Sequence, residues 1–266
     1  MANDLYTFWL PEKAEKSIKK YRDVENNYLL FNRLVVSGEK NSYIPYAQKK
    51  EKSKKHNSFI KIVSNNVLAI AESLPFHKTY EFIPDNKLAV GIGCESPFSS
   101  IALITLHPVY GIPYIPGSAI KGVIRNCYIQ KEFNGKEEEA LRDGNFIKLF
   151  GNSADSDNLG NSKQKLLFFD AFPNEEFEIS WDVQTPHFKD YYDREGKKQP
   201  LDTIEPNPIA FPVVKNTKFK IYICSYDKDC DLSLIENNNI LKDAFGTYGI
   251  GAKTSLGYGI GKISPE

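Results

Sequence analysis

The feature that most constrains the fold is a change of hydrophobic spacing at Pro116-Gly117. Residues 107–117 contain three prolines and two glycines, which is typical of a rigid loop. Beyond them, apolar residues recur at three- and four-residue steps and predict a helix with one buried face: Ile120, Val123, Ile124, Cys127 and Tyr128. Ser118 stands where a helix N-cap belongs. We therefore expect a rigid loop that delivers the chain into a helix at a defined residue.

The rest of the chain mixes helical and strand-like segments. Helices are expected near 11–21, 59–74 and 241–245, and strands near 87–93, 101–106, 165–170, 176–181 and 219–224. Their order lacks the regular alternation of a doubly wound parallel sheet, so the predicted class is α+β. We find no repeat and no linker. One domain is expected over 1–266, with an N-terminal helical extension at about 1–75 and a basic flexible loop at about 37–57.

Composition excludes several classes of protein. A chain of 266 residues can bury a core without a disulfide or a metal. Its four cysteines form no C-x-x-C pair, which favours reduced thiols over a disulfide framework or a zinc site. No run of 18 apolar residues occurs, so no membrane-spanning helix is expected. The first residues resemble no secretory signal. We expect a cytoplasmic protein with no cofactor and no metal.

The formal charge is neutral overall but uneven along the chain. Residues 1–60 carry a net charge of +5, whereas residues 132–206 carry −8. Five of the seven residues in 49–55 are lysines. Such a run is usually a solvated loop, but it also suits a polyanion, whose counterions it can release. The charge pattern permits nucleic acid as a partner without requiring it.

The predicted helix beginning near Gly117 is one candidate binding site. Free backbone N–H groups at a helix start attract anions, phosphate above all. Gly117 and Ser118 would supply such groups, and Lys121 and Arg125 lie one turn apart on one face. A phosphate at this end could therefore reach both cations. The alternative interpretation is a capped amphipathic helix with two surface cations.

The C-terminal residues 246–261 form a second candidate, with six glycines in sixteen residues. So many glycines are favoured where backbone must approach another group closely or adopt positive φ, and we expect one or the other at Gly249 and Gly251. Lys253 would add a cation. The segment lacks the Walker spacing, so nucleotide hydrolysis is not supported. The alternative interpretation is a tight β-hairpin.

Two other patterns could carry chemistry: a β-lactamase-like order of motifs, and His187. Ser118-x-x-Lys121, Ser156-Asp157-Asn158 and Lys253-Thr254-Ser255 follow the order of β-lactamase motifs, but Ser255 replaces the expected glycine, so acyl transfer is rejected. His187 follows Pro186 among aromatic residues and is the most site-like histidine. A ring held against an aromatic surface suits base stacking, although a histidine bonded to backbone is the ordinary alternative.

Two segments together resemble the RAMP superfamily of CRISPR-associated proteins. They are the run Ile112-Pro113-Tyr114-Ile115-Pro116-Gly117-Ser118-Ala119-Ile120-Lys121-Gly122 and the glycine-rich segment 246–261. Three further segments are similar to one branch, the sixth subunit of the type III-B (Cmr) effector complex: His107-Pro108, residues 167–173 and residues 185–192.

The resemblance implies a ferredoxin-like (RNA-recognition-motif-like) core with insertions and a glycine-rich C-terminal loop. It implies a non-catalytic backbone subunit in antiviral defence, beside other RAMP subunits of the complex and near the 3′ end of the guide RNA. In that family an aspartate of a neighbouring subunit cuts target RNA, and no acid lies between Pro97 and Arg125 here. The expected RNA contacts are Gly117, Ser118, Lys121, Arg125, His187, Gly249, Gly251 and Lys253.

The alternative function is a metal-independent endoribonuclease of the same superfamily that processes guide-RNA precursors. Such enzymes place a histidine as general acid or base, and His187 or His107 would serve.

Overall fold

The computed structural model describes residues 26–32, 35–37, 43–45, 56–92, 95–96, 99–102, 104–151, 166–184 and 209–266. The helices are α2 (Asn27–Asn32), α3 (His56–Glu72), α4 (Gly117–Glu132), α5 (Glu137–Ala140), α6 (Gly144–Phe150), α8 (Ser233–Glu236) and α9 (Ile240–Asp243). The strands are β1 (Val35–Ser37), β2 (Tyr43–Pro45), β3 (Phe76–Pro84), β4 (Glu95–Ser96), β5 (Ser99–Ala102), β6 (Leu166–Phe168), β7 (Phe172–Pro173), β8 (Glu178–Gln184), β9 (Ile209–Lys215), β10 (Phe219–Ser225) and β11 (Gly261–Pro265).

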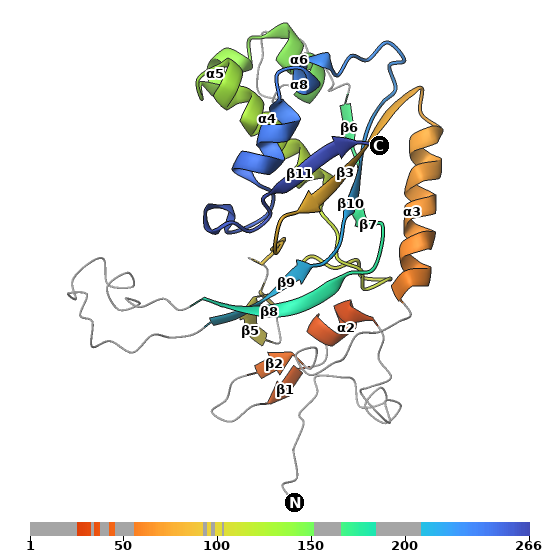
Figure 1. The fold of residues 1–266 in the computed structure, drawn as a ribbon, viewed down its shortest axis with the longest axis vertical. Helices are drawn as coiled ribbons and strands as arrows, with labels where there is room; N and C mark the ends of the chain where they lie inside the picture. Colours follow the sequence, from red (N-terminus) through yellow and green to blue (C-terminus); the bar gives the residue numbers. More distant parts are fainter. Residues whose placement is uncertain are drawn as a thin grey trace, which may run out of the picture.

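An antiparallel sheet forms the centre of the molecule. Its strands lie in the order β11-β3-β10-β6, and β7 also pairs with β10. Tyr80 of β3 and Phe168 of β6 stand opposite Ile221 and Ile223 of β10. Helices α4, α5, α6 and α8 gather on one side of this sheet, and α3 runs along the other (Figure 1). Mixed helices and antiparallel strands confirm the α+β class.

Alternate residues of β10 face opposite sides of the sheet, and both sides are covered. Ile221 and Ile223 belong to the main core together with Ile120 and Ile124 of α4. Tyr222 and Cys224 instead pack in a cluster with Ala71 of α3. The apolar face predicted for residues 118–128 is therefore confirmed, because α4 turns it to the sheet, and the helix expected at 59–74 covers the other side of the sheet through Ala71.

Strands β8 and β9 form a separate hairpin that extends from the main sheet (Figure 1). The ring of Trp181 in β8 stacks on Phe31 of α2 with 5.7 Å between ring centroids. Leu88 joins β9 to the chain after β3, since it exchanges two backbone hydrogen bonds of 2.8 Å with Val214. The hairpin is thus fixed at its base by packing and by backbone pairing.

The strand expectations were only partly correct. The expected strand at 87–93 is wrong: Leu88 makes one isolated bridge, and Gly91 turns the chain with a φ of +75°. Strands β3 and β9 were not anticipated. Strands β6, β8 and β10 lie in or overlap the segments expected as strands, and β5 overlaps the expected 101–106 strand. The helix expected at 11–21 lies outside the described residues.

The segment 37–57 was expected to be a basic flexible loop. Part of it is regular structure, because β2 pairs antiparallel with β1 and α3 already begins at His56. Residues 46–55, which contain the lysine run, lie outside the described residues.

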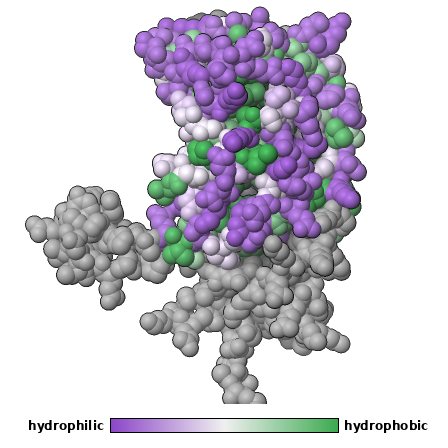
Figure 2. Space-filling view, viewed as in Figure 1, coloured by the Kyte–Doolittle hydropathy of each residue, from purple (hydrophilic) through white to green (hydrophobic). Residues whose placement is uncertain are grey.

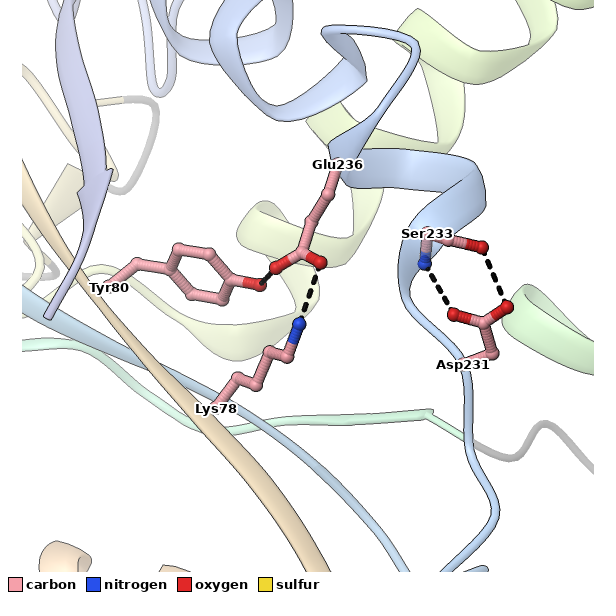
Figure 3. A network of polar contacts seen from close by, with 5 residues as sticks. All are labelled: Lys78, Tyr80, Asp231, Ser233 and Glu236. Carbon is pink, nitrogen blue, oxygen red and sulfur yellow. Dashed lines mark hydrogen bonds and ion pairs between the residues drawn. The ribbon is translucent and has the colours of Figure 1, made fainter.

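A polar network ties α8 to the sheet (Figure 3). The hydroxyl of Tyr80 donates to one oxygen of the Glu236 carboxylate, and the ammonium of Lys78 donates to the other, each over 2.6 Å. Burial raises the pKa of Tyr80 and the neighbouring carboxylate adds to this effect, so the phenol stays a donor. Asp231 accepts from the backbone N–H and the hydroxyl of Ser233 at the start of α8. Both contacts fix α8, which is followed by α9 and then by the glycine-rich segment.

Within the described ranges, no helix combines the length and the apolar character needed to cross a bilayer.

Candidate nucleic-acid interface

The start of α4 is docked on the chain that connects β6 and β7. Ile115 and Ala171 exchange backbone hydrogen bonds of 2.9 and 2.8 Å. The backbone N–H of Gly117 donates to Oδ1 of Asp170 over 2.8 Å. A carboxylate is favoured at this position because a helix start carries partial positive charge. The anion expected at this end of the helix is therefore supplied by the protein itself.

Two of the predicted contacts at this end need correction. Ser118 is not the N-cap: Pro116 holds that position without a side-chain hydrogen bond, and Ser118 is an exposed first-turn residue. Gly117 is buried, and a Cβ there would lie 2.1 Å from the carbonyl oxygen of Phe168. Its glycine is explained by close packing against β6. Its N–H is bonded to Asp170 and is not a free group for phosphate.

Lys121 and Arg125 share one face of α4, as predicted. The pKa of Lys121 lies below its usual value, first because burial partly removes water and second because Arg125 is positively charged nearby. Arg125 also makes contacts that were not anticipated. Its Nη2 lies 2.6 Å from Oε1 of Glu137, and its guanidinium lies 5.1 Å from the ring centroid of Phe146. The sequence thus predicted the pair of cations but missed the carboxylate that faces one of them.

The glycine-rich segment packs on the chain that follows β3. Gly249 and Gly251 have φ values of +74° and +96°, which confirms the expected positive φ at both. A Cβ on Gly251 would lie 2.4 Å from the carbonyl oxygen of Ala89, and Ala252 donates its N–H to the same oxygen over 2.7 Å. The alternative of a tight hairpin is wrong, because a π-helical turn (Ala244–Tyr248) and a 3₁₀ turn (Thr254–Leu256) occupy the segment.

Lys253 joins this segment to the β8–β9 hairpin. It is itself in the left-handed region, with a φ of +61°. Its ammonium donates to Oε1 of Gln184 and lies 4.9 Å from the ring centroid of Phe211. The contacts of Lys253 thus lead to the hairpin, whereas those of Arg125 lead to α5 and α6. The structure places the two groups of predicted cations on different elements.

Asp182 holds the same junction together. Lys87 and Tyr258 donate to its Oδ2 over 2.8 and 2.5 Å. Both hydrogen bonds lower the pKa of Asp182, and the one from Lys87 has the larger effect. Burial and this carboxylate raise the pKa of Tyr258 to about 12. No local pattern revealed the cluster, because its members lie on three distant segments.

Of the two candidate histidines, His107 is described and has a structural environment. Its Nδ1 accepts the backbone N–H groups of Val109 and Tyr110, each over 3.3 Å, and its ring stacks on Tyr110 with 4.7 Å between centroids. Partial burial lowers its pKa, against the opposing effect of Asp170. His187 lies outside the described residues. Among the residues that are described, no group of three acidic, cysteine or histidine side chains is arranged to hold a metal ion.

Comparison with protein families places these elements in context. The sequence profile of the RAMP superfamily matches residues 90–262, well over half of the chain. The chain belongs to the RAMP superfamily. The matched range of this RAMP protein contains α4, Asp170 and the glycine-rich segment, and it begins after β3.

Curated relatives narrow the branch of RAMP proteins that the chain resembles. It is 31% identical over 232 residues to the CRISPR system Cmr subunit Cmr6 of Pyrococcus furiosus, a match that covers 68% of this chain and 66% of that protein. It is 27% identical over 261 residues to the CRISPR system CMR subunit Cmr6 of Saccharolobus solfataricus, covering 94% of this chain and 76% of the relative.

A solved structure shows the same fold. A chain in the cryo-EM structure of the type III-B Cmr-beta bound to cognate target RNA superposes with a TM-score of 0.54. The match covers 82% of this chain and 68% of that one, at 21% sequence identity.

Two glycines of α4 provide a matched test of the docking. Gly117→Ala should lower the free energy of unfolding by about 1–3 kcal/mol, because the new methyl group cannot fit against Phe168. Gly122→Ala should raise it by about 0.5–1 kcal/mol, because nothing lies within 4 Å and alanine favours the helix. Urea unfolding followed by circular dichroism measures both. Equal effects of the two substitutions would contradict the docking of Gly117.

Proposed function

We propose that this chain is a non-catalytic, RNA-binding backbone subunit of a type III-B CRISPR effector complex. In this proposal it holds the 3′ part of the guide RNA in antiviral defence, beside other RAMP subunits of the Cmr complex. The observation that carries the proposal is the likeness to two relatives that are both named Cmr6 subunits. The polar chemistry of α4 supports an RNA-binding role independently of those names.

We infer that the core is ferredoxin-like. Strand β3, helix α4 and strand β6 form one strand–helix–strand unit, and β10, α8–α9 and β11 form a second. The sheet order β11-β3-β10-β6 places the fourth core strand beside the first, and the first beside the third. This order supports the ferredoxin-like assignment. A single RAMP domain over 1–266, with an extension up to about residue 75, is consistent with the matched range of 90–262.

The proposed RNA contact lies along the flank of α4. The positive charges of Lys121 and Arg125 lie close enough there to affect each other. Ser118 and Gly122 are exposed on the same helix. A glycine inside a helix costs about 1 kcal/mol relative to alanine, and the described residues offer no packing reason for Gly122. The open space at Gly122 suits the close approach of a nucleic-acid backbone. On the face seen in Figure 2, hydrophilic side chains cover the region over α5, α6 and α8.

A second proposed contact lies at the glycine-rich segment. Gly249 and Gly251 support the turns that place Lys253, whose own left-handed backbone is unusual for a lysine. Lys253 lies next to the hairpin end at Gln184, three residues before His187. We propose that Lys253 binds a phosphate and that His187, which lies outside the described residues, stacks on an RNA base.

The non-catalytic part of the proposal rests on the environment of His107. A general base needs a ring nitrogen with a free lone pair. Here Nδ1 already accepts two backbone N–H groups, so the neutral ring carries its proton on Nε2 and the lone pair of Nδ1 is engaged. This favours a structural role for His107 over an endoribonuclease role.

The α4 contact predicts a specific salt dependence. The double variant Lys121→Ala/Arg125→Ala should flatten the slope of log affinity against log salt by about 1.4–1.8 units, since each lost phosphate contact removes about 0.7–0.9. Anisotropy of labelled single-stranded RNA measures it. The control Lys228→Ala/Lys262→Ala removes the same charge from exposed positions on other elements and should leave the slope unchanged. Equal slopes for both double variants would place the RNA elsewhere.

The absence of catalysis predicts that the purified protein leaves labelled repeat RNA intact in a metal-free buffer. His187→Gln should also keep target-RNA cleavage by the assembled complex within about tenfold of the unmodified rate, the loss that corresponds to about 1.4 kcal/mol, because the residue is proposed to stack on a base and not to transfer a proton. Discrete cleavage that disappears in His187→Ala would overturn this part of the proposal.

A further inference from the structure

Arg125 is held by two groups that differ in kind. Phe146 of α6 is fully buried, and the guanidinium lies over its ring. Glu137 is the first residue of the short helix α5, and its side chain is 59% exposed. The ring is part of the core and cannot leave. The carboxylate is at the surface, where it can turn away without exposing any apolar group.

The two contacts also differ in how easily they are broken: the ion pair with Glu137 is the weaker one. An exposed ion pair contributes little and is weakened by salt. A guanidinium over an aromatic face keeps its plane and its donors in place when the carboxylate leaves. Those donors match a phosphate as well as they match a carboxylate. Arg125 therefore remains positioned for an oxyanion whether or not Glu137 is paired with it.

We propose that Glu137 occupies, in the RNA-free protein, the position on Arg125 that an RNA phosphate takes in the complex. Glu137 is then a specificity-determining residue of the site. The inference rests on the proposed function, because it concerns the same face of α4.

The arrangement selects for a polyanion. An isolated phosphate must displace Glu137 with the charge of one phosphate group. A nucleic-acid strand brings further phosphates along the flank of α4 in the same binding event. The carboxylate thus reduces binding of single anions more than binding of RNA.

The test compares two neighbouring glutamates in the full-length protein. Glu137→Gln removes the competing carboxylate, and Glu138→Gln removes the same charge from the next, also exposed residue. Anisotropy of a labelled single-stranded RNA should show Glu137→Gln binding about two- to fivefold more tightly than Glu138→Gln, the range that an exposed ion pair allows. In an Arg125→Gln background this difference should vanish, because the guanidinium for which Glu137 and the phosphate compete is then absent.

Each outcome decides the inference. Equal affinities of Glu137→Gln and Glu138→Gln, or weaker binding by Glu137→Gln, would overturn it, and this comparison needs no change at Arg125. A difference that persists in Arg125→Gln would also overturn it. If the salt slope still flattens in the Lys121/Arg125 double variant, the proposed RNA contact on α4 survives such a result. If that slope does not flatten, the inference and the proposed contact on α4 both fail.

Discussion

The structure depends on how the first turn of α4 docks against the chain between β6 and β7. Gly117 lies so close to the carbonyl of Phe168 that no side chain fits between them, and its N–H is bonded to Asp170. This contact fixes the rotation of α4 about its axis. Ile120 and Ile124 consequently face the core, while Lys121 and Arg125 lie toward the surface.

The same contact determines where an anion can bind. A helix start normally offers free N–H groups to phosphate. Asp170 already uses the first of them, so the cations on the flank of α4 are the better site for a polyanion. The protein also supplies a carboxylate on that flank, through Glu137, but there the carboxylate is exposed and exchangeable. One internal anion is therefore structural, and we propose that the other competes with RNA.

Local patterns in the sequence predicted what depends on local periodicity. The helices α3 and α4 were found in this way because their apolar residues recur at three- and four-residue steps, and β10 was found because it is apolar from Ile221 to Cys224. Glycine content also predicted either positive φ or close approach at Gly249 and Gly251, and both have positive φ.

Long-range contacts were not predictable from such patterns. Asp170 binds the first N–H of a helix that begins 53 residues earlier in the chain. Local sequence therefore offered only Ser118 as a cap. The pairing of Glu137 with Arg125 depends on how α5 folds back on α4. Strand β3 was missed because Lys78 interrupts the alternation of Phe76, Tyr80 and Phe82, and the partner of Lys78 is Glu236 on α8.

Chemical footprinting of lysines would test the central claim, that RNA lies on the flank of α4. The full-length protein is acetylated with and without saturating single-stranded guide RNA, and the rate at each lysine is read by mass spectrometry. The account predicts that RNA slows acetylation of Lys121 and leaves Lys228 and Lys262 unchanged. An unchanged rate at Lys121, under conditions where anisotropy shows the RNA to be bound, would contradict it.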